Sequence, residues 1–209
     1  MIVEGKQKIW ADYQKDIPDD HYFYVRSCIR QAFFPGSEVT FLDITRNKLG
    51  KDFYESAYHT TCGGIAYHSD SIPQETAMTI IARQFALMHE CGYENYVCSC
   101  ITSFGCYTET LETWHEFPEL EAKIRQYLWD SCKKEFAKPK YLAHASDIIY
   151  KFRHDIAKQA KYKLINAKTG QPLKVVEHIG CHYSKMFPSK GFGGAEYPHV
   201  LVGMIEAWG

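Results

Sequence analysis

The sequence lacks several features that would assign it to a common class. It has no apolar run near the roughly 20 residues that a membrane-spanning helix needs. Its first residues include Glu4, Lys6 and Lys8 and contain no apolar segment of the kind found in signal peptides. Its 24 Lys and Arg nearly balance 25 Asp and Glu, which gives a net charge of −1. We therefore expect a cytoplasmic protein with no membrane span and no nucleic-acid partner.

Familiar catalytic patterns are missing as well. The sequence contains no phosphate-binding P-loop, no GxGxxG dinucleotide fingerprint and no Ser/His/Asp arrangement. It therefore identifies no catalytic residue. Its 209 residues are 45% apolar and 15% aromatic, which is typical of a folded chain with a substantial core.

The eight cysteines are the most informative residues. Without a visible secretory signal, they indicate ligands or redox thiols more than a disulfide framework. Four of them follow runs typical of strands, at 21–27, 53–61 and 93–97: Cys28, Cys62, Cys98 and Cys100. Thiolates at the ends of successive strands of one sheet can converge on one point. A metal or iron–sulfur centre needs that geometry.

Strand-like and helix-like segments alternate along the chain. Strands are predicted near 21–27, 53–58, 93–97 and 173–179, and helices near 37–50, 73–92, 104–116, 119–136, 145–158 and 197–208. Strands that alternate with helices of this length indicate βαβ units with a parallel sheet. The predicted fold is α/β, with two Rossmann-like halves whose parallel sheets are flanked by helices and carry cysteines at strand ends.

The cysteine pattern resembles that of a known family. Cys28, then Thr61-Cys62-Gly63-Gly64, then Cys100-Ile101-Thr102-Ser103, and later Gly180-Cys181-His182, is similar to the cysteine-rich CCG domain of the heterodisulfide reductase B-subunit family. The family pattern is a lone Cys, a Cys-Cys-Gly and a Cys-x-x-Cys, given twice. In the family each set holds a non-cubane [4Fe–4S] cluster, which reduces a disulfide with electrons relayed from partner subunits.

The resemblance implies a division of the chain. Residues 1–20 would form an N-terminal arm, and 21–136 would form the first CCG-like half with the cysteine site. Residues 137–209 would form a linker and an incomplete second half, because only Cys181 of the second set appears before the sequence ends.

The resemblance also implies the ligands, position by position. Cys28, Cys62 and Cys100 match family cysteines, whereas Thr61 and Ser103 stand where the family has two more. Cys98 is expected as the fourth thiolate. Further candidates are Cys106, Cys181 and His182. Three matching cysteines of five favour an ordinary [4Fe–4S] cluster over the non-cubane form.

Structural roles are expected for other residues. Cys91 and Cys132 lie in or beside predicted helices and are expected to be small buried hydrophobes. His59, His68 and His178 are expected to be turn or core residues. Gly63 and Gly64 would expose backbone N–H groups to the site.

Three functions from different classes remain open. The first is an iron–sulfur electron-transfer or thiol–disulfide oxidoreductase subunit, assembled with flavin or iron–sulfur subunits similar to those of heterodisulfide reductase. The second is a cluster-poor subunit that serves assembly of such a complex. The third is a zinc-stabilised binding module, because four thiolates also suffice for tetrahedral zinc.

Overall fold

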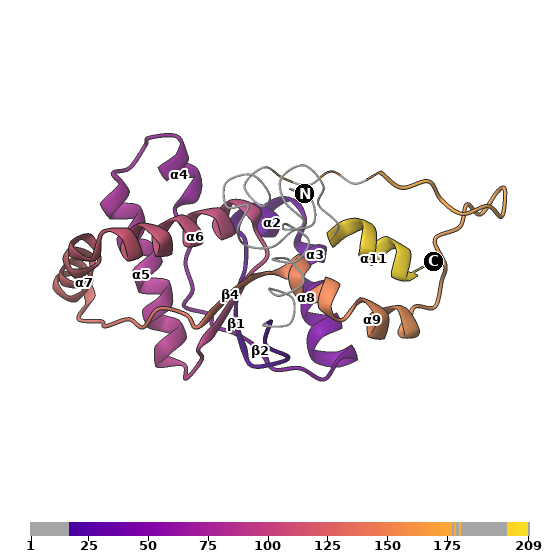
Figure 1. The fold of residues 1–209 in the computed structure, drawn as a ribbon, viewed down its shortest axis with the longest axis horizontal. Helices are drawn as coiled ribbons and strands as arrows, with labels where there is room; N and C mark the ends of the chain where they lie inside the picture. The colour runs from indigo at the N-terminus through magenta and orange to yellow at the C-terminus, as the bar shows by residue number, and fades with distance from the viewer. Residues whose placement is uncertain (1–16, 177, 179, 181–199, 209) are drawn as a thin grey trace, which may run out of the picture.

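The computed structural model describes residues 17–176, 178, 180 and 200–208. Within them, four strands form one parallel sheet in the order β2-β1-β3-β4 (Figure 1). The strands are β1 (Tyr22–Val25), β2 (Phe53–Glu55), β3 (Asn95–Cys98) and β4 (Tyr141–His144). The predicted α/β class with a parallel sheet flanked by helices is confirmed.

Helices connect the strands and cover both faces of the sheet (Figure 1). They are α2 (Cys28–Phe33), α3 (Pro35–Leu42), the π-helical segment η1 (Asp43–Lys48), α4 (Gly64–His68), α5 (Gln74–Glu90), α6 (Ile101–Glu116), α7 (Pro118–Cys132), α8 (Ala145–Lys151), α9 (Arg153–Gln159) and α11 (Val200–Trp208). Helices α5, α6 and α7 pack together, as do α8, α9 and α11. Among the residues that are described, no helix is long and apolar enough to cross a membrane.

Alternation along β1 shows why both faces are buried. Phe23 and Val25 join a core that includes Phe85 and Trp114, under α5 and α6. The intervening Tyr22 and Tyr24 join a second core with Phe41 of α3. Because successive strand residues point to opposite faces, a strand with four buried residues requires cover on both sides.

The predicted helix boundaries differ in detail from those observed. Pro118 starts α7, as its restricted φ favours, but α7 ends at Cys132, where Lys133 adopts a left-handed conformation. The helix predicted at 145–158 is two helices, because Phe152 leaves helical geometry between α8 and α9.

The region assigned to the second half contributes a strand to the first sheet. β4 pairs with β3 in parallel, with Cys98 opposite His144. Residues 173–176 and 178 form no strand, contrary to the prediction of a strand at 173–179. Val176 in this segment is exposed, and just before it an isolated bridge joins Ile165 to Pro172. The division into two halves stays a prediction.

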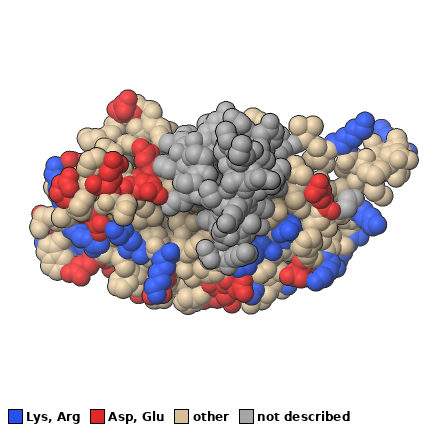
Figure 2. Space-filling view, in the orientation of Figure 1, with Lys and Arg blue, Asp and Glu red and all other residues tan. Residues whose placement is uncertain are grey.

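Charges of both signs share the surface shown in Figure 2. Several form pairs between segments: Lys123 of α7 lies 2.6 Å from Glu75 of α5, and Lys134 lies 2.5 Å from Glu90. Exposed pairs of this kind contribute about 0–1 kcal/mol each, so the apolar cores dominate the stability.

The strand order places a topological switch point between β1 and β3. The chain leaves β1 for β2 on one side and then crosses back to β3 on the other. Connections that depart in opposite directions from neighbouring strands leave a crevice at the carboxyl ends of those strands. Ligands of open parallel sheets bind in such crevices.

His144, at the end of β4, is a buried neutral base that caps α8. Its Nδ1 accepts from the backbone N–H of Ser146 at 3.3 Å, and its Nε2 lies 3.2 Å from the carbonyl oxygen of Ser99. Burial, with a smaller contribution from Arg30, lowers the pKa of His144 to about 3. The folded state therefore holds the imidazole neutral.

This pKa predicts a pH dependence of stability. The unfolded chain binds a proton at His144 below about pH 6.5 and the folded chain does not, so stability is lost as the pH falls from that value. The loss from this group should be about 2 kcal/mol between about pH 6.5 and pH 5. Urea unfolding across that range should show a shallower pH slope for His144→Gln than for the wild type. Equal slopes would contradict the assignment.

Candidate functional site

Three cysteines line one open pocket at the carboxyl end of the sheet. Cys28 begins α2 after β1, Cys62 lies between β2 and α4, and Cys100 caps the start of α6 after β3. All three line a pocket of about 350 Å³, together with Thr61 and Ser103. The structure thus brings these three strand-end cysteines to one pocket, and their role as ligands of a common centre stays a prediction.

A buried carboxylate fixes the two loops on either side of the switch point. Glu38 of α3 accepts hydrogen bonds from the backbone N–H of Ser27 at 3.2 Å and from the Ser99 hydroxyl at 2.6 Å. The Tyr24 hydroxyl donates to its other oxygen. Ser27 precedes Cys28 and Ser99 precedes Cys100. One side chain therefore sets the spacing of the two loops that carry these thiols.

Cys62 is the most enclosed of the three thiols. Its sulfur accepts hydrogen bonds from the Ser103 hydroxyl at 3.1 Å and from the backbone N–H of Gly64 at 3.3 Å. The neighbouring Cys106 thiol lowers the pKa of Cys62, with smaller contributions from these two donors, although burial opposes them. The same contact and burial raise the pKa of Cys106. Donors to a thiolate suit a sulfur that serves as a ligand or nucleophile.

The two glycines after Cys62 are both required by the local geometry. Gly63 has φ of +70°, a left-handed conformation that glycine adopts without strain. A Cβ on Gly64 would lie 2.7 Å from the Cys106 sulfur and 3.1 Å from the Cys62 sulfur. The absence of a side chain lets the backbone N–H approach the thiols, as expected from the sequence.

Residues with hydroxyl groups occupy the two positions where the family that the cysteine pattern resembles has further cysteines. Thr61 Oγ1 lies 3.7 Å from the Cys28 sulfur, and Ser103 Oγ donates to Cys62. Both residues line the pocket. The alignment of motifs therefore agrees with the spatial arrangement, and two of the five positions carry hydroxyls instead of thiols.

Cys98 does not reach this pocket. β3 ends at Cys98, so Cys98 and Cys100 do not share one strand. The Cys98 side chain is 1% exposed, and its thiol lies 3.8 Å from the carbonyl oxygen of Cys100 and 3.9 Å from that of Ala143. Burial raises its pKa well above the usual value. These surroundings are those of a neutral core thiol.

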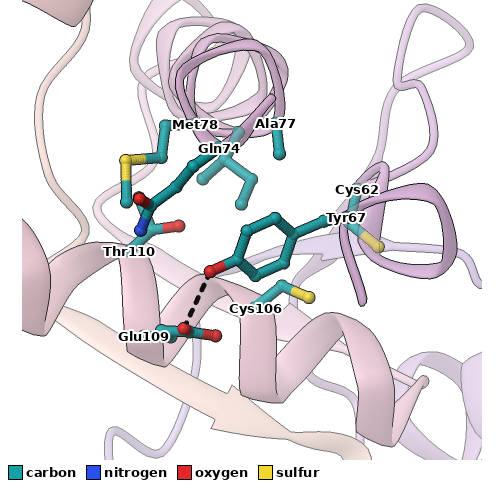
Figure 3. A pocket seen from close by; sticks show the side chains of 9 residues that line it. Cys62, Tyr67, Gln74, Ala77, Met78, Cys106, Glu109 and Thr110 are labelled. Carbon is teal, nitrogen blue, oxygen red and sulfur yellow. Dashed lines mark hydrogen bonds between the residues drawn. The ribbon is translucent and has the colours of Figure 1, made fainter. Parts of the chain in front are cut away.

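Cys106 lies on α6 behind Cys62, beside a small cavity of about 10 Å³ (Figure 3). Its sulfur is 3.2 Å from Nε2 of His68, at the end of α4. The Tyr67 hydroxyl donates to Glu109 across the same cavity at 2.9 Å. The sequence predicted only a turn or core role for His68. The spacing of Ser103 and Cys106, three residues apart on one helix face, was the available signal.

The remaining candidates fall elsewhere. Cys132 is exposed at the end of α7, so the prediction that it is a buried hydrophobe is wrong, and Cys91 is partly buried. Cys181 and His182 lie outside the described residues.

The described residues contain no group of three or more His, Cys, Asp or Glu side chains that could hold a metal ion. The expected ligand set therefore stays a prediction.

The fold and site define a parallel α/β protein with strand-end cysteines around an open pocket. The chain is 25% identical over 202 residues to the B subunit of the ferredoxin:CoB-CoM heterodisulfide reductase of Methanosarcina acetivorans, a match that covers 93% of this chain and 62% of the relative. The predicted likeness to the heterodisulfide reductase B subunit is thus confirmed as a distant relationship. No protein-family model matches the chain. The chain spans less than two thirds of that relative's length.

Replacing Glu38 tests the role of the buried carboxylate. Glu38→Ala leaves three buried donors without an acceptor and should lower the free energy of unfolding by about 3 kcal/mol or more. Glu38→Gln keeps an acceptor oxygen and should cost less. Guanidinium unfolding measures both, with the exposed Glu119→Ala, expected within about 0.5 kcal/mol of wild type, as the control. Equal effects of Glu38→Ala and Glu119→Ala would refute the role.

Proposed function

We propose that this chain is an iron–sulfur subunit that transfers electrons in the reduction of a disulfide, within a multi-subunit complex similar to heterodisulfide reductase. The observation that carries the proposal is the shared pocket of Cys28, Cys62 and Cys100 at the switch point of the sheet. The distant relationship to a heterodisulfide reductase subunit supports it.

The cofactor that fits this pocket is a [4Fe–4S] cluster held by these three thiolates. Cys98 is left out of the proposed set because its thiol faces carbonyl groups beneath the pocket. The donors to the Cys62 sulfur, Ser103 and Gly64, are of the kind that tune the potential of a cluster. The cluster would supply one-electron transfer, and the protein residues would set its position and its exposure to water.

Partner subunits are expected because a site that transfers electrons needs a source of electrons. A single site in a chain without a nucleotide fingerprint needs a neighbouring donor of electrons, for which a flavin or iron–sulfur subunit is suited. Exposed apolar side chains lie on the same segment as Cys28: Phe33 is 73% exposed and Phe34 is 66% exposed. Exposed apolar residues of this kind are typical of a surface that binds another protein.

The assembly subunit is the second candidate, because Thr61 and Ser103 occupy two positions of the family's ligand set. The same apolar residues, Phe33 of α2 and Phe34 after it, would bind the other subunits in that role. Metal content distinguishes the two functions, and it also identifies a zinc protein directly.

Replacing Cys62 tests the cluster. Anaerobically purified wild-type chain, reconstituted with iron and sulfide, should show visible absorbance and bound iron. Cys62→Ala should reduce both to background because it removes a central ligand. Cys132→Ser, at the exposed end of α7, should match the wild type. Full iron content in Cys62→Ala would contradict the ligand assignment, and zinc in place of iron would favour the binding module.

Cys98 and Cys100 provide a second, matched comparison. Cys100→Ala should lose the iron, whereas Cys98→Ala should keep it and lower the free energy of unfolding by about 1–2 kcal/mol through the lost packing. Iron content and guanidinium unfolding measure the two effects. Loss of iron in Cys98→Ala with a native circular dichroism spectrum would restore Cys98 as a ligand.

A further inference from the structure

Cys62 lies between two cavities with different access to solvent. On one side it lines the open pocket with Cys28 and Cys100. On the other it lines the small cavity of Figure 3, where Cys106 is its neighbour. Cys106 is 2% exposed and does not line the open pocket. A molecule in the pocket therefore meets Cys62 first, with Cys106 behind it.

The two sulfurs are neighbours on one side of Gly64. Both lie beside Gly64, at 3.1 Å (Cys62) and 2.7 Å (Cys106) from the point where its Cβ would be. The Cys62 and Cys106 side chains also interact directly. Cys62 comes from the loop after β2 and Cys106 from α6, so a bond between them would join these two elements covalently.

The polar neighbours of each sulfur suit different roles. The Ser103 hydroxyl and the Gly64 N–H donate to Cys62 and favour it as the attacking thiolate. Nε2 of His68, 3.2 Å from the Cys106 sulfur, is placed to exchange a proton with that thiol. An attacking sulfur that lines the open pocket, with a second thiol shielded behind it, is the arrangement that thiol–disulfide exchange needs.

We propose that Cys62 and Cys106 form a redox-active dithiol that is oxidised by small disulfides entering the open pocket. The Cys62 sulfur attacks one sulfur of the disulfide, whose S–S bond breaks to release a thiol and leave a mixed disulfide. The Cys106 sulfur then attacks Cys62 and releases the second thiol. The protein loses two electrons and two protons to form the Cys62–Cys106 disulfide, and the small disulfide gains them.

The dithiol also controls whether Cys62 can serve as a ligand, a consequence that rests on the proposed function. A sulfur in a disulfide offers no thiolate to iron. Thr61 and Ser103 carry hydroxyls, so neither supplies a thiolate in its place. Oxidation therefore blocks loading of the cluster, and reduction of the pair restores it.

The test of the dithiol uses the full chain without metal, kept anaerobic and treated with oxidised glutathione. After alkylation, peptide mass spectrometry should find Cys62 joined to Cys106 with the loss of both free thiols. Cys106→Ser should instead retain glutathione on Cys62, because nothing displaces it. Cys132→Ser should form the same Cys62–Cys106 disulfide as the wild type.

Two results would overturn the dithiol. One is persistent glutathione on Cys62 in the wild type, and the other is a disulfide from Cys62 to Cys28 or Cys100. The disulfide map of the wild type decides between these outcomes even if Cys106→Ser fails to fold. Circular dichroism reports whether that variant folds. Cys106→Ala is a second variant without the thiol.

Loading the oxidised and the reduced chain with iron and sulfide then tests whether the dithiol controls binding of the cluster. The oxidised chain should bind background iron until a reductant is added, whereas the reduced chain should bind iron at once. Iron binding with the Cys62–Cys106 disulfide intact would refute the claim that the dithiol controls cluster loading, and it would leave the proposed function standing. No iron in either state, with the disulfide mapped as expected, would refute the proposed function and leave the dithiol standing.

Discussion

The buried carboxylate of Glu38 is the interaction on which the geometry of the site depends. It accepts hydrogen bonds from Tyr24, Ser27 and Ser99, which belong to the ends of β1 and β3. A buried charge is tolerated when several donors satisfy it, and its removal leaves those donors unpaired. The same contacts hold the loops at the switch point of the sheet, so stability of the fold and spacing of the thiols share one cause.

Two kinds of environment separate the cysteines of this chain. At the open pocket, Cys62 receives hydrogen bonds from Ser103 and Gly64, which favour the charged thiolate. In β3, Cys98 is buried against carbonyl groups, which favour the neutral thiol. Cysteines of similar position in the sequence thus differ in chemistry. The local polar groups, and not the distance along the chain, decide which of them is favoured as a thiolate.

Much of this arrangement can be predicted from sequence patterns, whereas some of it depends on tertiary contacts that no local pattern shows. Cys28, Cys62 and Cys100 were predicted because cysteines after successive strands of a parallel sheet meet at one edge. The role of Cys98 depended on where β3 ends, and strand ends are the least predictable boundaries. His68 and Cys106 meet because α4 packs against α6, a tertiary contact without a local signature. β4 was missed because Tyr141–His144 is short and leads directly into α8.

The central claim is that thiolates from three strand ends hold one iron–sulfur cluster at the switch point of the sheet. Iron anomalous diffraction from crystals of the reconstituted chain, grown without oxygen, tests it most directly. The iron atoms of one cluster are expected in the pocket, with the sulfurs of Cys28, Cys62 and Cys100 each bonded to a different iron. Iron located elsewhere in the chain, or bonded to only one of these sulfurs, would contradict it.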